Sequence, residues 1–212
     1  MWVRYFSLIC LYSFCFVSLA TPQTFEGISI EPEENSPSYE RSFYRHWIDA
    51  DEDDEKTRDE VLIEESLVPV MIQENSRGNR KVVTGLWVGP YTGLVTTNPK
   101  KLQIDHMVPL KEAHISGARN WNSQKKRDFA NDLELPQALI AVKGGANQSK
   151  GSRDPAHWMP PNRSYWCHYI EGWVTVKKKW GLSMDQAEVD AIKTGRKVCS
   201  KYKSGDALQG RH

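Results

Sequence analysis

The sequence predicts an α+β fold whose centre runs strand, helical insertion, strand, turn and helix. Three features indicate this order: a strand-like run at residues 102–110, an apolar buried-strand pattern at residues 139–142, and a glycine turn at residues 144–145 followed by a short helix. Such alternation of short strands and helices is typical of a small mixed domain rather than of an all-helical or all-strand protein.

The remaining elements follow from local patterns on either side of this centre. Between the two central strands, residues 111–116 and 123–133 favour helices, the second with Phe129 and Leu133 one turn apart on an inward face. The other expected elements are a helix at 57–66, a hairpin at 82–95 with its turn at 89–93, and two C-terminal helices at 165–182 and 183–198.

The first twenty residues have the layout of a secretion signal. Arg4 supplies a positive charge, residues 5–19 are almost all apolar or small, and Ser18-Leu19-Ala20 places small residues where a signal peptidase cleaves. The apolar run is shorter than the roughly 20 residues that a spanning helix needs, which disfavours the alternative of a membrane anchor. We therefore expect residues 1–20 to be a signal peptide, and the protein to be secreted, extracellular and free of membrane association.

The rest of the chain is long enough for one compact domain. Residues 21–38 are polar, acidic and rich in proline, so we expect a flexible arm there. A single domain is then expected over residues 39–203, with a disordered tail at 204–212. Cys167 and Cys199 are the two cysteines outside the signal, and in an oxidising compartment an even pair favours a disulfide over free thiols.

A net charge of +1 conceals a strong asymmetry along the chain. Residues 26–74 contain sixteen acidic and four basic residues, whereas residues 76–212 contain eleven acidic and twenty-three basic residues, a balance of +12. A basic body suits a polyanionic partner, because neutralised phosphates supply most of the affinity for nucleic acid that does not depend on base sequence. A solvated lysine-rich surface is the alternative.

The candidate chemistry lies at the end of the first central strand. Asp105 and His106 are adjacent, so their side chains point to opposite faces of a strand and can divide two tasks. The carboxylate can hold a hard divalent cation, while the imidazole accepts a proton near neutral pH. Asn147, at the start of the following helix, offers an amide oxygen to the same ion. Lys150, one turn further on, could contact a substrate phosphate.

Four segments in order resemble the HNH endonucleases: Asp105-His106-Met107-Val108-Pro109-Leu110, then residues 129–133, 139–142 and 147–151. More narrowly, they are similar to a secreted subfamily related to the C-terminal nuclease domain of GmrSD-type restriction enzymes. The resemblance extends outward to residues 58–62, 85–93, 154–161, 169 and 173–177, and so covers residues 43–199. The ordered set is more specific than any single motif.

The resemblance implies a ββα-metal (HNH) core with a helical insertion and additional C-terminal helices. It implies that His106 is the general base and that Asp105 and Asn147 hold one divalent cation, Mg²⁺ or alternatively Mn²⁺, which stabilises the phosphate and the leaving oxygen. HNH enzymes usually have a middle asparagine just before the second strand, where this chain has Gln137-Ala138. Gln137 or the upstream Asn131 is expected to support the histidine instead.

An acidic segment upstream is a second candidate ion site. Asp49, Asp51, Asp53 and Glu60 have the offsets of carboxylates in an EF-hand calcium loop, although Asp54 stands where such loops need glycine. A solvated acidic segment is the alternative to Ca²⁺ binding. Arg58 beside it is expected to meet a phosphate or to pair with these acids.

Two sequons are present, Asn147-Gln148-Ser149 and Asn162-Arg163-Ser164, and of these Asn162 is expected to carry the glycan.

Two functions are consistent with these features. The first is a secreted, metal-dependent HNH-type endonuclease that hydrolyses the phosphodiester bonds of DNA, or alternatively RNA, without sequence selectivity and without an obligate protein partner. Neither a zinc finger nor a helix-turn-helix pattern for reading bases is visible. The second is a non-catalytic secreted protein that binds calcium or the extracellular matrix on the same scaffold. The three residues Asp105, His106 and Asn147 discriminate the two, since a structural protein has no physical reason to keep them.

Overall fold

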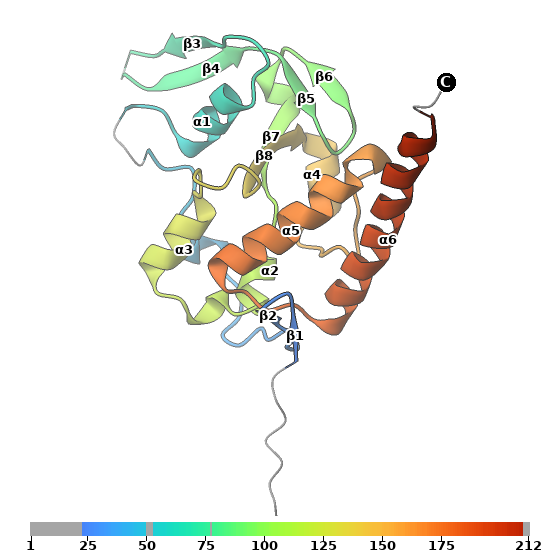
Figure 1. Ribbon diagram of the computed structural model, residues 1–212. Helices are drawn as coiled ribbons and strands as arrows, with labels where there is room; N and C mark the ends of the chain where they lie inside the picture. The colour runs from blue at the N-terminus through green and yellow to red at the C-terminus, as the bar shows by residue number, and fades with distance from the viewer. Residues whose placement is uncertain (1–22, 50–52, 77, 210–212) are drawn as a thin grey trace, which may run out of the picture.

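A computed structural model of the chain describes residues 23–49, 53–76 and 78–209 (Figure 1). The predicted signal peptide, residues 1–20, lies outside the described residues. Across the three described ranges, no helix is long and apolar enough to cross a bilayer.

The centre of the molecule is a two-stranded antiparallel sheet followed by a short helix. Strand β7 (Leu102–His106) pairs with β8 (Leu139–Lys143), and α4 (Gly144–Lys150) follows β8 directly. The insertion between the strands holds three short helices: α2 (Leu110–Ile115), η3 (Ala118–Asn120) and α3 (Ser123–Ala130). The predicted order of strand, helical insertion, strand and helix is therefore confirmed, whereas the predicted turn at residues 144–145 was wrong, because both glycines belong to the first turn of α4.

The two faces of this sheet pack against different parts of the chain, because alternate strand residues point in opposite directions. Ile104 and Leu139 face a smaller apolar cluster that includes Leu62 and Trp87. Ile140 and Val142 face the main core, which contains the buried aromatic residues Tyr44, Tyr91, Tyr169 and Trp173. Both strands are thus buried on both faces, which accounts for the continuous apolar run at residues 139–142.

Helix α1 and two hairpins cover the first of these faces (Figure 1). Helix α1 (Thr57–Glu64) falls within the helix predicted at 57–66. The hairpins pair β3 (Met71–Glu74) with β4 (Arg80–Thr84), and β5 (Trp87–Gly89) with β6 (Leu94–Thr96). A 3₁₀ turn, η2 (Pro99–Lys101), leads from β6 into β7.

The prediction of one hairpin over residues 82–95 was wrong in its first half. Val82 pairs with Ile72 of β3, and the predicted turn joins only β5 to β6. The chain changes partner at Gly85, where a Cβ would lie 2.6 Å from the ring of Trp87. The indole of Trp87 closes over this glycine and donates a hydrogen bond of 2.8 Å to the Leu62 carbonyl.

Helix α3 is shorter than the predicted helix at 123–133. It ends at Ala130 because Asn131 leaves the helical backbone conformation and bonds through its side chain to two other segments, at Arg45 and Ile48 and at Thr57. Leu133 then lies beyond the helix and is 40% exposed, so its expected inward position was also wrong.

The segment expected to be a flexible arm, residues 21–38, packs against the domain over its described part. Strands β1 (Thr24–Phe25) and β2 (Ile28–Ser29) form a small hairpin, and Ile28 is 3% exposed within the main core. The backbone of Ile30 bridges to Met184. Apolar residues at two-residue spacing outweigh the polar composition here, because Ile28 enters the main core and Ile30 packs against it.

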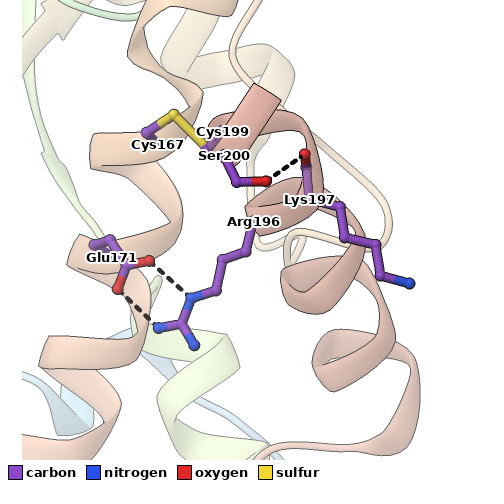
Figure 2. The surroundings of a disulfide bond; sticks show 6 residues. All are labelled: Cys167, Glu171, Arg196, Lys197, Cys199 and Ser200. Atoms are coloured by element: carbon purple, nitrogen blue, oxygen red, sulfur yellow. Dashed lines mark hydrogen bonds and ion pairs between the residues drawn. A yellow bond between two sulfur atoms is a disulfide. The ribbon is translucent and has the colours of Figure 1, made fainter. Parts of the chain in front are cut away.

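The C-terminal helices lie side by side and are joined by the predicted disulfide (Figure 2). After η4 (Arg163–Tyr165) come α5 (Trp166–Trp180) and α6 (Gln186–Gln209), and Cys167 of α5 is bonded to Cys199 of α6. The guanidinium of Arg196 donates two hydrogen bonds of 2.7 Å to the carboxylate of Glu171. Helix α6 reaches Gln209, so the expected disordered tail at 204–212 is helical over its described part.

A buried carboxylate fastens α1 to the central sheet. The Glu65 side chain, just after α1, accepts a 2.9 Å hydrogen bond from the backbone N–H of Ala141 in β8. Burial raises the pKa of Glu65 from 4.5 to about 7, against the opposing effect of that hydrogen bond. Between pH 4.5 and about 7, Glu65 is protonated in the folded chain and ionised in the unfolded chain. The stability that this proton provides is lost as the pH rises through this window.

We expect Glu65→Gln to remove this pH dependence, since a glutamine amide still accepts from Ala141 but does not titrate. The melting temperature of the variant should fall less than that of the wild type between pH 4.5 and 7.5, as measured by thermal unfolding. Glu64→Gln removes the same charge from an exposed neighbour and is the control. Parallel pH profiles for the two variants would contradict the assignment.

Candidate active site

A cleft of about 310 Å³ lies between the end of β7, the start of α2 and helix α4. Asp105, His106 and Asn147 all line this cleft, together with Gln103 and Lys111. The structure thus brings together the three residues in which the sequence placed the chemistry. Two come from the last positions of one strand, and the third comes from the middle of the helix that follows the paired strand.

The Asp105 carboxylate is held by two partners and is 5% exposed. Its Oδ2 accepts a 2.6 Å hydrogen bond from the hydroxyl of Tyr91 and a 2.5 Å contact from the ammonium of Lys150. Burial raises the pKa of Asp105 and lowers that of Lys150, because loss of solvent penalises both charged forms, while the contact between them opposes both shifts. With Oδ2 engaged twice, Oδ1 is the oxygen that remains for a ligand.

Lys150 is not placed to contact a substrate phosphate, as the sequence had suggested. Its side chain is fully buried, and its ammonium donates to Asp105 and, at 2.7 Å, to the backbone carbonyl of His106. The last residue of α4 points at the end of β7 because the helix packs directly on that strand. Lys150 therefore fastens α4 to β7 and neutralises a buried carboxylate.

The imidazole of His106 is oriented by a backbone carbonyl. Its Nε2 lies 3.0 Å from the carbonyl oxygen of Ala130, which can only accept, so Nε2 carries the hydrogen and Nδ1 carries the lone pair. The ring centroid is 5.5 Å from that of Trp47. Burial lowers the pKa of His106 to about 3, and nearby positive charge adds to this effect. His106 is therefore neutral at physiological pH and has one nitrogen able to accept a proton.

Asn131 holds the carbonyl that orients His106, in a way that Gln137 does not. Its amide nitrogen donates to the carbonyls of Arg127 and Arg45 at 2.7 and 2.8 Å. Its amide oxygen accepts from the hydroxyl of Thr57 at 2.9 Å. These bonds fix the end of α3, where Ala130 is located. The side chain of Gln137 is exposed, so of the two candidates only Asn131 is positioned for the supporting role.

Asn147 presents an oxygen donor to the cleft. Its amide nitrogen donates a 3.0 Å hydrogen bond to the side-chain oxygen of Gln103, two residues before Asp105 on the same face of β7. This bond leaves the amide oxygen as the atom that can accept a ligand. One carboxylate oxygen and one amide oxygen in an open cleft suit a hard cation such as Mg²⁺ that retains several waters. The side chains present therefore fit the divalent ion that the resemblance implies.

Several residues of the cleft were not singled out from the sequence. Tyr39 and Arg41 come from a segment far upstream of the motif, and they reach the cleft through tertiary packing. Only Gln103 had a local signal, since it shares a strand face with Asp105. Tyr91, in the turn between β5 and β6, does not line the cleft but holds Asp105 from behind it.

Arg58 lies away from this cleft. Its guanidinium donates two hydrogen bonds of 3.1 Å to the carbonyls of Pro99 and Leu102, at the opposite end of β7 from Asp105. It lines a second hollow beside β4 and η2. Arg58 is therefore not part of the cleft that holds Asp105, and a phosphate contact at Arg58 stays a prediction. The guanidinium satisfies backbone carbonyls where η2 turns into the strand.

Two described carboxylates of the acidic segment, Asp49 and Asp53, accept hydrogen bonds from backbone groups, and Glu55 pairs with Arg80. Asp49 accepts from the N–H of Asp54, and Asp53 accepts from the N–H of Glu55, whereas Asp51 lies outside the described residues. In the described ranges, the group of three acidic side chains close enough to share an ion is Glu33, Glu112 and Asp154, with ligand atoms within 4.8 Å of one another. The candidate Ca²⁺ site at residues 49–60 stays untested, since Asp51 lies outside the described residues.

Residues 56–194 match the family described as the C-terminal domain of GmrSD restriction endonucleases. The match covers more than half of the chain, and the chain belongs to this family of HNH-type nuclease domains. It is also 36% identical over 183 residues to an "Uncharacterized secreted protein" of Arthroderma benhamiae, a match that covers 86% of each chain. No solved structure matches the chain.

The buried pair of Asp105 and Lys150 can be tested by stability measurements. Lys150→Met keeps most of the side-chain volume but leaves a carboxylate buried without its cation. We expect a loss of about 3–5 kcal/mol in the free energy of unfolding, the cost typical of breaking a buried ion pair. Lys143→Met, at the exposed last position of β8 just before the same helix, should cost far less. Equal costs for the two substitutions in urea unfolding would show that the pair does not form.

Proposed function

We propose that the protein is a secreted, metal-dependent endonuclease of the HNH type that hydrolyses phosphodiester bonds in nucleic acid. The observation that carries this proposal is the convergence of Asp105, His106 and Asn147 on one cleft, within a strand–strand–helix unit of a chain that belongs to a nuclease family. In the proposed ββα-metal core, β7, β8 and α4 are the three elements. The secreted relative and the predicted signal peptide support an extracellular location.

His106 acts as the general base in this proposal. Its Nδ1 lone pair accepts the proton of the attacking water, while the bond from Nε2 to the Ala130 carbonyl holds the ring in the required tautomer and compensates part of the charge that the ring gains. Because burial lowers the pKa of His106, the ring is unprotonated when the substrate binds.

Asp105 and Asn147 hold the divalent cation with one oxygen each. When bound, the cation supplies charge stabilisation to the phosphate and to the leaving 3′ oxygen. Lys150 and Tyr91 restrain the other oxygen of Asp105, so the carboxylate keeps one orientation toward the cleft. Gln103 does the same for Asn147 by occupying its amide nitrogen.

The substrate in this proposal is DNA without sequence selectivity, with RNA as an alternative. Residues 76–212 carry a balance of +12 that suits a polyanion. Binding then proceeds through backbone charge rather than base edges, since no element recognisable from the sequence reads bases.

Substitutions in the cleft test the roles directly. We expect His106→Ala to lower plasmid cleavage by about 10²–10⁴-fold while leaving the affinity for Mg²⁺ nearly unchanged, because the ring transfers protons and does not bind the ion. Asn147→Ala should raise the Mg²⁺ concentration needed for half-maximal cleavage. His168→Ala, an exposed histidine on α5, is the control. Cleavage by His106→Ala within tenfold of the wild type would remove His106 from the mechanism. No cleavage by the wild type with Mg²⁺ or Mn²⁺ would favour the non-catalytic alternative.

The two sequons should differ in glycan occupancy if Asn147 is a metal ligand. Asn162 lies on a partly exposed loop, where its amide nitrogen donates to the Pro90 carbonyl at 2.9 Å, and we expect a glycan there in material from a glycosylating host. Asn147 should be unmodified in active protein, because a glycan would fill the cleft. Intact-glycopeptide mass spectrometry measures both sites. Full occupancy of Asn147 in a sample that still cuts DNA would exclude it as a ligand.

A further inference from the structure

One wall of the cleft comes from outside the family-matched segment. Residues 39–48, which we call the strap, precede the match at 56–194 and contain the 3₁₀ turn η1 (Arg41–Phe43). Tyr39 and Arg41 of the strap line the same cleft as Asp105 and His106. The strap also reaches the proposed base itself, since the rings of His46 and Trp47 lie 6.1 and 5.5 Å from that of His106.

The strap is fastened to the domain at its middle and at its C-terminal end. Tyr44 is fully buried, and its hydroxyl lies 3.1 Å from Nδ1 of His114 in α2. Further along, the Asn131 side chain donates to the carbonyl of Arg45 and accepts from the N–H of Ile48 at 3.4 Å. The strap is therefore a fixed part of the wall and holds its side chains in place before substrate binds.

Within the strap, His46 holds the side chain of Arg41. Nδ1 of His46 lies 2.7 Å from the Tyr44 carbonyl and must carry the hydrogen, so its Nε2 accepts a 3.1 Å hydrogen bond from the Arg41 guanidinium. Burial lowers the pKa of His46, which keeps the ring neutral and able to accept. This contact uses one of the five N–H donors of a guanidinium. Arg41 is exposed on the wall of the cleft.

The charge of Arg41 lies in the same cleft as Asp105 and His106. The other cation near Asp105, Lys150, is buried and already paired, so Arg41 and Lys111 are the cationic side chains of the cleft that can meet a substrate. A guanidinium matches the geometry of a phosphate with two parallel hydrogen bonds.

Resting on the proposed nuclease function, we propose that the strap completes the active site and that Arg41, oriented by His46, binds a phosphate of the nucleic-acid backbone beside the scissile bond. The substrate contact that the sequence assigned to Lys150 is then made by a residue more than a hundred positions earlier. His46 is a positioning residue, because it acts on the substrate only through Arg41.

The test uses the full chain with His106→Ala, in which slow cleavage lets binding to a fluorescein-labelled 12-base-pair duplex be measured. In this background we expect Arg41→Gln to weaken duplex binding at least tenfold, the effect typical of losing a charged hydrogen bond. The slope of log affinity against log salt should fall by about 1, the loss of one phosphate contact. Arg45→Gln is the matched control: it removes an exposed arginine of the same strap that does not line the cleft. It should change the affinity less than threefold.

A double-variant cycle that combines His46→Ala with Arg41→Gln measures the role of His46. His46→Ala should weaken duplex binding, and adding it to Arg41→Gln should cause little further loss, because the two residues act as one unit. If His46 had only a structural role, the losses of duplex affinity caused by His46→Ala and Arg41→Gln would be independent and would add. The melting temperature of each variant confirms that the fold is retained.

Equal effects of Arg41→Gln and Arg45→Gln would overturn the proposal and leave the nuclease function intact, with general surface charge as the source of affinity. A chain with native His106 that neither cuts nor binds the duplex would overturn both. Additive losses in the cycle would overturn the role of His46, since Arg41 would then bind phosphate without it.

Discussion

The buried contact between Asp105 and Lys150 is the interaction on which the arrangement of the site depends. A carboxylate removed from water is costly unless cations and hydrogen-bond donors surround it. Lys150 supplies the charge from the last residue of α4, and Tyr91 supplies a hydroxyl from the turn between β5 and β6. Helix α4 must therefore pack against the end of β7, and this packing sets Asn147 one turn earlier, at the edge of the cleft.

The orientation of His106 depends on a second set of bonds, from three parts of the chain. The carbonyl that fixes its tautomer belongs to Ala130, and the end of α3 is held by Asn131. Asn131 also bonds to Thr57 at the start of α1 and to the backbone of Arg45 in the strap. In HNH enzymes an asparagine near the second strand is expected to support the histidine. In this protein Asn131, eight residues before β8, holds the carbonyl that contacts His106.

The long insertion and the C-terminal helices stabilise this small centre. A two-stranded sheet and one short helix bury too little apolar surface to be stable alone. The insertion packs α2 against α5 and α6 through a buried contact in which Lys177 lies 2.8 and 2.6 Å from the carboxylates of Glu112 and Glu188. The disulfide between Cys167 and Cys199 then joins the two last helices. These contacts form the rigid support that a precise cleft requires.

The sequence by itself determined the order of the central elements, the disulfide partners and the residues Asp105, His106 and Asn147, because these depend on local periodicity, short motifs and the number of cysteines. Only the tertiary structure decided that Lys150 is buried, that β4 pairs with β3, that the upstream segment packs, and that Arg41 lines the cleft. The physical reason is that burial and hydrogen-bond partners are set by residues distant in the chain. The local sequence pattern of a lysine three residues after Asn147 is the same whether its side chain faces solvent or a buried carboxylate.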